Sequence, residues 1–332
     1  MRFAVVCSVR NEGPFLVEWV AWYRRLGFTD IVVVTNDCTD RSPDLLDALQ
    51  AAGWLTHLRH DVPDGTNICA RKLEAAKALP QVAQADWVLV CDVDEFLVIH
   101  RGAGQITDLI PAQPDFLGMA INWRVFGTSG QTIWQDGLVH RQFTKAAAAT
   151  DFASTWVKTL HARPGWFRKL GEHGPKRLLP RHAARWGQKG LAWVNADGHD
   201  LPEWRPDGDY MRRMPAERVS FATAQMNHYM IRSDESFSLK RGTLSSVAGK
   251  DRYTDGYYAR YNRNEVEDRS ALRHGDAFDT VHAEAMALPG VARLHHLCCA
   301  DYVGRLAARA GRDPAVDPRH AAHLVAAAAA GP

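Results

Sequence analysis

The sequence has no long hydrophobic run, no large excess of one charge sign and no C-x-x-C motif. No segment approaches the roughly 18 consecutive apolar residues of a membrane-spanning helix. The apolar run at the N-terminus ends at Arg10, which is too early for a secretory signal. We therefore expect a cytoplasmic protein without a transmembrane segment, and leave open a peripheral contact with the inner face of the membrane.

Charge and cysteine usage narrow the class further. The 40 basic and 38 acidic residues give a formal net charge of +2 and are interspersed along the chain. Proteins that bind nucleic acid usually carry a basic face, so we expect no nucleic-acid partner. The 6 cysteines show no C-x-x-C spacing, which favours a reducing compartment over a disulfide framework.

What the sequence does contain is an alternation of strand-like and helix-like segments in its first half. Short apolar runs typical of buried strands are "RFAVVCSV", "DIVVVTN", "WLTHLRH" and "DWVLVCDVD". Between them, helical periodicity is found in "FLVEWVAWYRRLG", "SPDLLDALQAAG" and "NICARKLEAAKALP". This alternation predicts an α/β fold with a doubly wound, mostly parallel sheet.

A polar cluster follows each of the four expected strands. In chain order the clusters are "SVRNEG", "TNDCTD", "RHDVPDG" and "CDVDE". One such cluster alone is typical of a solvent-exposed turn. Because ligands of open α/β sheets bind at the carboxyl ends of the strands, four clusters in register predict one shared site.

The fourth cluster places Asp92, Asp94 and Glu95 against a strand that otherwise has a core pattern. Ionised carboxylates in such a position need a partner or a cation. Two carboxylates spaced D-x-D can hold Mg²⁺ or Mn²⁺, and the cation would leave positions open for phosphate oxygens of a diphosphate ligand. Since the acidic groups repel one another, we expect Asp94→Ala to leave the free energy of unfolding unchanged or raised.

Several segments together resemble bacterial glycosyltransferases of the family 2 type, which have the GT-A fold. They are "VRNE", "TNDCTDRS", "DWVLVCDVDEFL", "NWRVFGTSG" and "HY…S…SLKRG". The subgroup with a D-x-D-E-F core, near the DUF23 and family 92 enzymes, is the most similar, and the resemblance covers roughly residues 1–270. It implies a Rossmann-like nucleotide-binding half, a loop-rich acceptor region and C-terminal helices.

The resemblance also implies roles for individual residues. The nucleotide would contact the two loops after the first and second strands, together with the first aspartate of the D-x-D pair: Arg10, Asn11, Glu12, Asn36, Asp37, Asp40 and Asp92. The metal, Mn²⁺ or Mg²⁺, would be held by Asp94 and His228 beside Asp92, with His173 as the second choice of histidine. The family usually has D-D-x-S in its acidic loop, and Asn36 replaces the first aspartate here.

The implied reaction moves a sugar from a UDP- or GDP-sugar to a glycan or lipid-linked acceptor, with inversion. Lys240, Arg241 and Lys158 are candidates for stabilising the leaving diphosphate. An inverting enzyme also needs a carboxylate that accepts the proton of the acceptor hydroxyl. The candidates for this base remain open and are Asp268, Glu172, Asp197 and Glu203.

The second half is less regular. We expect loops around short strands over residues 140–215 and alanine-rich helices after residue 270. Trp123 is our candidate for an acceptor contact, because aromatic faces stack on sugar rings. "HHLCC", residues 295–299, has metal-ligand residue types but no second cluster, which favours a structural role over a zinc site.

We accordingly divide the chain into three parts: a nucleotide-sugar-binding half (1–125), an acceptor-side and metal-completing half of the same domain (126–270), and a helical extension (271–332). Two alternative functions stay open. One is a phosphohydrolase of the haloacid dehalogenase type that would use Asp92 as its nucleophile. The other is a non-catalytic module that binds a nucleotide sugar. A nucleotidyltransferase is disfavoured, because "SVRNEGP" has only one glycine for a phosphate loop.

Overall fold

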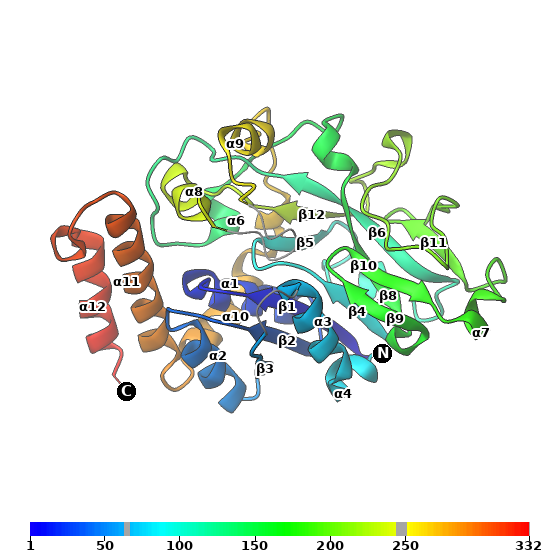
Figure 1. Ribbon diagram of the computed structural model, residues 1–332, viewed down its shortest axis with the longest axis horizontal. Coiled ribbons are helices and arrows are strands. Elements are labelled where there is room, and N and C mark those ends of the chain that lie inside the picture. Colours follow the sequence, from blue (N-terminus) through cyan, green and yellow to red (C-terminus); the bar gives the residue numbers. More distant parts are fainter. Residues whose placement is uncertain (63–66, 244–250, 332) are drawn as a thin grey trace.

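The computed structural model describes residues 1–62, 67–243 and 251–331 and shows a large sheet flanked by helices (Figure 1). The strands that carry the fold are β1 (Phe3–Val9), β2 (Asp30–Thr35), β3 (Thr56–Arg59), β4 (Trp87–Val90), β5 (Glu95–Ile99), β6 (Phe116–Val125), β8 (Val157–Ala162), β11 (Ala192–Asn195) and β12 (Ala224–His228). Smaller strand pairs are formed by β7 (Lys145–Ala146) with β13 (Val266–Glu267), and by β9 (Phe167–Gly171) with β10 (Gly174–Leu178).

Helices connect the strands and extend the chain at its end. The first half contains α1 (Gly13–Arg25), α2 (Ser42–Ala51), α3 (Ile68–Ala78), α4 (Pro80–Ala83) and α5 (Ile106–Leu109). The remainder contains α6 (Val139–Gln142), α7 (Pro180–Ala183), α8 (Asp234–Lys240), α9 (Asp255–Tyr261), α10 (Gly275–Met286), α11 (Val291–Arg309) and α12 (Pro318–Ala329). None of the helices in the described ranges combines the length and the apolar character that crossing a membrane requires.

The strand order of the large sheet is β3-β2-β1-β4-β8-β6-β12-β5, with β11 added on β6. The first four strands are parallel, and their order is that of the first half of a Rossmann fold. β8 runs antiparallel to β4 and β6, while β12 is parallel to β6 and antiparallel to β5. The predicted fold class, an α/β fold with a mostly parallel sheet, is therefore confirmed.

Both faces of the parallel strands are covered. Alternate side chains of β1 point to opposite faces, so Val5 and Cys7 pack in the main core with α1 and α2. Ala4 and Val6 pack with Leu73 of α3 in a smaller cluster on the other face. This is the doubly wound arrangement that the alternation of segments predicts.

The expected polar clusters do follow the strands. The loops after β1, β2 and β4 emerge at the same edge, because these strands are adjacent and parallel. Three residues of the cluster after β3, Pro63, Asp64 and Gly65, lie outside the described residues. Residues 140–215 form short strands joined by loops, and helices follow residue 274, as expected.

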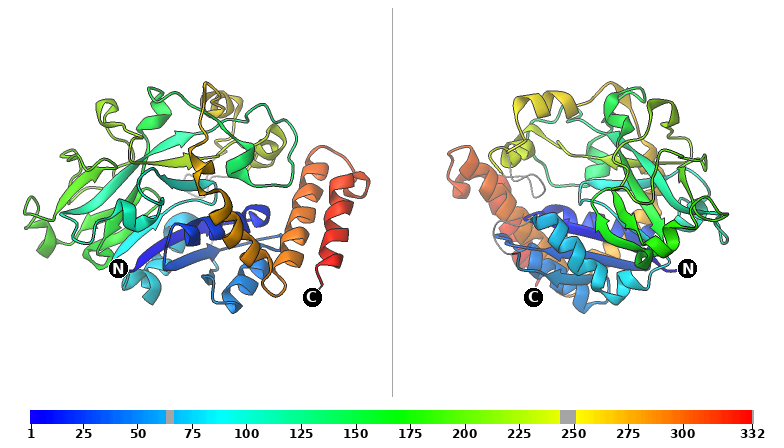
Figure 2. Two further views of the ribbon diagram at one scale, coloured as in Figure 1. Left: turned by 180° about the vertical axis from the view of Figure 1, so that it is seen from behind. Right: turned by 45° about the vertical axis from the view of Figure 1, so that its right-hand side comes forward.

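The C-terminal helices α10 and α11 contribute to the main core, and α12 packs against α11. α11 and α12 lie together at one end of the molecule, beside α1 and α2, and β9 and β10 lie toward the opposite end (Figures 1 and 2). A Cβ atom at Gly13 would lie 2.5 Å from Cβ of Cys298, so only a glycine at the start of α1 permits this approach of α11. Arg319 of α12 forms an ion pair with Glu235 of α8, at 2.7 Å between Nη1 and Oε2.

Candidate active site

The acidic turn between β4 and β5 directs its three carboxylates into different environments. Trp19 donates from Nε1 to the carbonyl of Asp92 (3.1 Å), and the amide of Asp92 donates to Oε2 of Glu95 (2.8 Å). These bonds fix the turn. The side chain of Asp92 is 51% exposed, whereas that of Glu95 is fully buried and that of Asp94 nearly so.

A buried lysine joins two of these carboxylates. Nζ of Lys158, on β8, lies 2.9 Å from Oε2 of Glu95 and 3.2 Å from Oδ2 of Asp92. It also donates to the carbonyl of Glu172 (2.7 Å). Burial disfavours the charged amine, but the two carboxylates outweigh burial and hold the pKa of Lys158 well above its usual value. Lys158 is therefore a permanent cation at this edge of the sheet.

The third carboxylate lies between a histidine and a second lysine. Oδ1 of Asp94 is 3.4 Å from Nε2 of His228, and Oδ2 is 3.1 Å from Nζ of Lys240. Burial favours the neutral acid, but Lys240 and His228 outweigh it, so the pKa of Asp94 lies well below its usual value. Lys240 also donates to the carbonyl of Met230 (2.8 Å).

Strand pairing explains how His228, distant in sequence, reaches the acidic turn. β12 runs antiparallel to β5, with His228 directly opposite Glu95. Nδ1 of His228 lies 3.6 Å from Oε1 of Glu95, and neither atom has a hydrogen-bond partner among the described residues. The His228 ring packs against Trp123 at 4.3 Å between centroids, and Trp123 stacks on Trp156 at 5.4 Å.

Trp123, the expected acceptor contact, is only 7% exposed and supports the histidine ring. His173, the second choice for the metal, lies in the same aromatic group, 5.4 Å from Trp123. It donates from Nδ1 to the carbonyl of Val157 (2.8 Å), the residue before Lys158. Burial, aided by Lys158, lowers the pKa of His173 to about 3, so this ring stays neutral.

The loops after β1 and β2, which we expected to bind the nucleotide, are bonded to each other. Oδ1 of Asn11 accepts the amides of Thr39 (2.7 Å) and Asp40 (3.3 Å). Asp40 in turn accepts from the amides of Gly13 (3.4 Å) and Ser42 (3.0 Å), the first residues of α1 and α2. Asn11 and Asp40 thus hold the two loops together and cap two helices.

The remaining members of these loops are more accessible or less completely bonded. Arg10 is exposed and donates from Nε to the carbonyl of Asp37 (3.1 Å). Asn36 is buried and donates to Oδ2 of Asp37 (2.8 Å), while its own Oδ1 has no partner in the described part of the chain. These three residues keep polar atoms available for a ligand.

Two buried cations at this edge were not predicted. Arg232 lies between Glu12 (Nη1 to Oε2, 3.0 Å) and the ring of Phe15, and its Nε and Nη2 have no partner among the described residues. Lys72 of α3 is buried and donates to the carbonyl of Val9 (3.3 Å), and burial lowers its pKa. A lysine within an amphipathic helix normally indicates a solvated face, so the sequence carried no signal for Lys72.

The structure places the four candidates for the catalytic base in different parts of the molecule. Glu172 lies beside Lys158 and accepts a hydrogen bond from the hydroxyl of Tyr210 (2.8 Å). Asp268 is bound to Arg124 (2.9 Å) and Gln225 (3.0 Å), on the face of β6 and β12 opposite Trp123 and His228. Asp197 accepts from the amide of Thr223 (3.0 Å), after β11. Glu203 is 3.9 Å from Arg218. Of the four, Glu172 is the one whose backbone is bound to the acidic turn, through the contact of its carbonyl with Lys158.

The arrangement fits a cation held by two protein ligands. Adjacent ligands of Mg²⁺ or Mn²⁺ lie about 3 Å apart at metal–ligand distances near 2.1 Å, which is close to the separation of Asp94 Oδ1 and His228 Nε2. Such cations are commonly bound by one or two side chains plus substrate phosphates. Lys240 neutralises Asp94 in the ligand-free arrangement, so a cation would share or replace this ion pair.

Two cavities, of about 320 and 460 Å³, lie away from this cluster. The first is bordered by Met1, Trp87 and Arg163, at the start of β4. The second is bordered by Thr132, Asp234 and Leu306. Ligands of open α/β sheets bind at the opposite, carboxyl ends of the strands, where the charged side chains converge. The candidate site is therefore the cluster of charged side chains at these strand ends, and neither of the two cavities.

Comparison with known proteins gives structural neighbours only. No family model matches the sequence, and no curated protein matches it. Residues 1–349 of TarS from S. aureus align with 98% of this chain and 90% of their own, at 10% identity and a TM-score of 0.36.

Other solved neighbours belong to more than one reaction class. The mannosyltransferase PcManGT from Pyrobaculum calidifontis, solved with GDP-Man and Mn²⁺, aligns over 99% of this chain and 86% of its own, at 14% identity and a TM-score of 0.34. A putative glucose-1-phosphate thymidylyltransferase from Bacillus anthracis aligns over 86% and 95%, at 11% identity and a TM-score of 0.27.

The ion pair between Asp94 and Lys240 reverses the expectation for Asp94→Ala. Removal of the carboxylate would leave a largely buried ammonium that keeps the carbonyl of Met230 as its partner among the described residues, so the free energy of unfolding of the metal-free protein should fall by roughly 2–4 kcal/mol. Adding Lys240→Met should restore at least about 1 kcal/mol. Urea denaturation of the two single variants and the double variant measures this coupling. Strictly additive losses would contradict it.

Glu95 should make stability depend on pH. Burial, opposed by Lys158, raises the pKa of Glu95 from 4.5 to about 7. Between these values the native state keeps a proton that the unfolded state has lost, so the contribution of Glu95 to stability falls as pH rises. The difference in unfolding free energy between wild type and Glu95→Gln should therefore fall by about 3 kcal/mol from pH 4.5 to pH 7. A difference that stays constant across this range would refute the assignment.

Proposed function

We propose that this chain is a metal-dependent glycosyltransferase that moves a sugar from a nucleoside-diphosphate donor to a hydroxyl acceptor, with inversion at the anomeric carbon. The observation that carries the proposal is the pairing of Asp94 with His228 at a spacing suited to one divalent cation, at the carboxyl ends of parallel strands. Around this pair lie the ammonium groups of Lys158 and Lys240 and the guanidinium of Arg232.

This distribution of charge suits a diphosphate leaving group. Mn²⁺ or Mg²⁺ held by Asp94 and His228, beside Asp92, would neutralise the charge that develops on the diphosphate. Lys240 is already at Asp94 and would turn its ammonium toward the phosphate oxygens. Arg232 is buried with two nitrogen atoms unpartnered in the described chain, and such donors are available to an anion.

The nucleoside would lie on the loops after β1 and β2. Arg10, Asn36 and Asp37 offer donors and acceptors there, and Asn11, Glu12 and Asp40 hold these loops in place. Asp92 is half exposed at the adjoining edge and suits a ribose hydroxyl. UDP and GDP sugars are the donors we propose.

Glu172 is the base that this geometry favours. Its backbone carbonyl is bound to Lys158, and its partly exposed side chain is oriented by the hydroxyl of Tyr210. A carboxylate in this position would accept the proton of the acceptor hydroxyl as that oxygen attacks the anomeric carbon. We propose a glycan or lipid-linked acceptor that enters beside Trp123 and Trp156. Asp268 instead holds Arg124 on the other face of the sheet.

Thermal denaturation with nucleotides tests the proposal directly. UDP or GDP should raise the melting temperature by about 3–6 °C only when Mn²⁺ is present, because the ligand binds the folded protein through the cation. His228→Asn should abolish this shift. Hydrolysis of an aryl phosphate without nucleotide would instead support the phosphohydrolase with Asp92 as nucleophile. Nucleotide binding without any transfer would support a binding module.

The assignment of the base predicts different effects for two conservative substitutions. Glu172→Gln should lower kcat by roughly 10²–10⁴-fold while donor affinity changes little, because it removes the proton acceptor and leaves the diphosphate site intact. Asp268→Asn is the matched control and should keep kcat within about tenfold of wild type. Single-turnover sugar transfer, with binding measured separately, distinguishes them. The reverse order of effects would exclude Glu172.

A further inference from the structure

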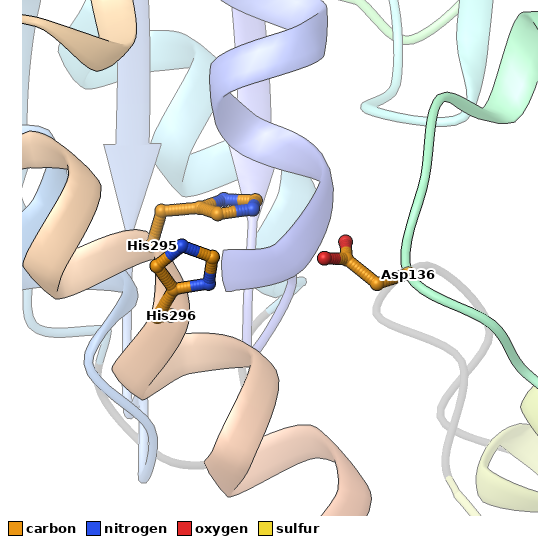
Figure 3. A group of neighbouring side chains, drawn as sticks. All are labelled: Asp136, His295 and His296. Carbon is orange, nitrogen blue, oxygen red and sulfur yellow. The ribbon is translucent and has the colours of Figure 1, made fainter. Parts of the chain in front are cut away.

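A second group of metal-ligand side chains lies far from the acidic turn, on the C-terminal helices. His295 and His296 are consecutive residues of α11, and Asp136 faces them from the loop before α6 (Figure 3). Each residue offers one ligand atom, and the three atoms lie within 4.8 Å of one another. No sequence pattern links "HHLCC" with Asp136, because the two lie far apart along the chain.

The imidazole of His295 is buried and has one nitrogen atom available for a ligand. The residue is only 9% exposed, and its Nδ1 has no hydrogen-bond partner among the described residues. Its Nε2 lies 3.7 Å from Sγ of Cys299, one helical turn further along α11. A proton on Nε2 would face this sulfur and leave the lone pair of Nδ1 free. A buried nitrogen without a partner is costly, and a metal ion would satisfy it.

The second histidine is also oriented by a neighbour. Nδ1 of His296 lies 3.3 Å from Nδ1 of His323 on α12, a distance at which one ring donates to the other. When His296 is the donor, its other nitrogen keeps a lone pair for a metal. Ligating histidines commonly use their second nitrogen in this way, and the hydrogen bond fixes the ring.

We propose that Asp136, His295 and His296 form a Zn²⁺ site, with water in the remaining position. Two imidazoles and one carboxylate are a ligand set that zinc prefers, at distances of about 2.0–2.2 Å. Asp136 is exposed, so the ion can enter from solvent. The site would tie the loop before α6 to α11 and is separate from the cation site at Asp94 and His228.

Metal titration of the full chain tests the site. Wild-type protein freed of metal should bind one equivalent of Zn²⁺ at this site with a dissociation constant of about 1 μM or tighter, measured against a chromophoric chelator. Co²⁺ should give the visible absorption of a low-symmetry site with nitrogen and oxygen ligands. Asp136→Asn and His296→Gln should each weaken the binding at least tenfold. Both residues are accessible enough that the variants should fold.

A matched control separates this site from surface histidines and from the site of transfer. His320→Gln, on α12 but outside the group, should bind Zn²⁺ as wild type does. Asp94→Asn should keep the Zn²⁺ equivalent and lose the Mn²⁺-dependent effect of nucleotides. Equal Zn²⁺ affinity in wild type, Asp136→Asn and His296→Gln would overturn the proposal, as would the absence of binding at 100 μM.

Discussion

The buried ammonium group of Lys158 is the interaction on which the edge of the sheet depends. Its charge compensates the carboxylates of Asp92 and Glu95, and it also binds the carbonyl of Glu172. The acidic turn, β8 and the segment at Glu172, which are distant in sequence, therefore meet at one cation. Without it, burial would raise the pKa of Glu95 further and favour the protonated carboxyl, which accepts from the amide of Asp92. The same balance recurs at Asp94 with Lys240 and at Glu12 with Arg232. Charge compensation by long cationic side chains therefore shapes the site before any ligand binds.

The fold could be predicted because local patterns and strand order agree. Apolar runs and helical periodicity locate β1 to β4 and the helices between them, and parallel pairing brings the following loops to one edge. The position of Asp92, Asp94 and Glu95 at the end of β4 follows from the same pattern. That these carboxylates need partners also follows from elementary electrostatics.

The local pattern does not specify the partners, because they come from long-range packing, and only the family resemblance pointed to His228, Lys158 and Lys240. Lys158 and His228 reach the acidic turn through the pairing of β8 with β4 and of β12 with β5, which no local period specifies. The sequence likewise cannot distinguish Glu172 from Asp268 as the catalytic base, since both lie in polar segments. Only the folded sheet places them in different surroundings. Residue type alone also cannot tell whether Asn11 and Asp40 hold helix ends or bind a nucleotide, because both roles use the same side chains.

The ion pair between Arg319 and Glu235 gives the last helix an influence on the ion pair between Asp94 and Lys240. Glu235 stands in the first turn of α8 and Lys240 at its end, so the orientation of that short helix decides where the ammonium group can reach. Arg305 of α11 donates to the carbonyl of Asn11 and braces the first loop from the same side. Helices α11 and α12 thus support α8 and the loop after β1 from one side. Shortening the chain at α12 would therefore disturb the placement of charged groups far from it, and not only remove exposed surface.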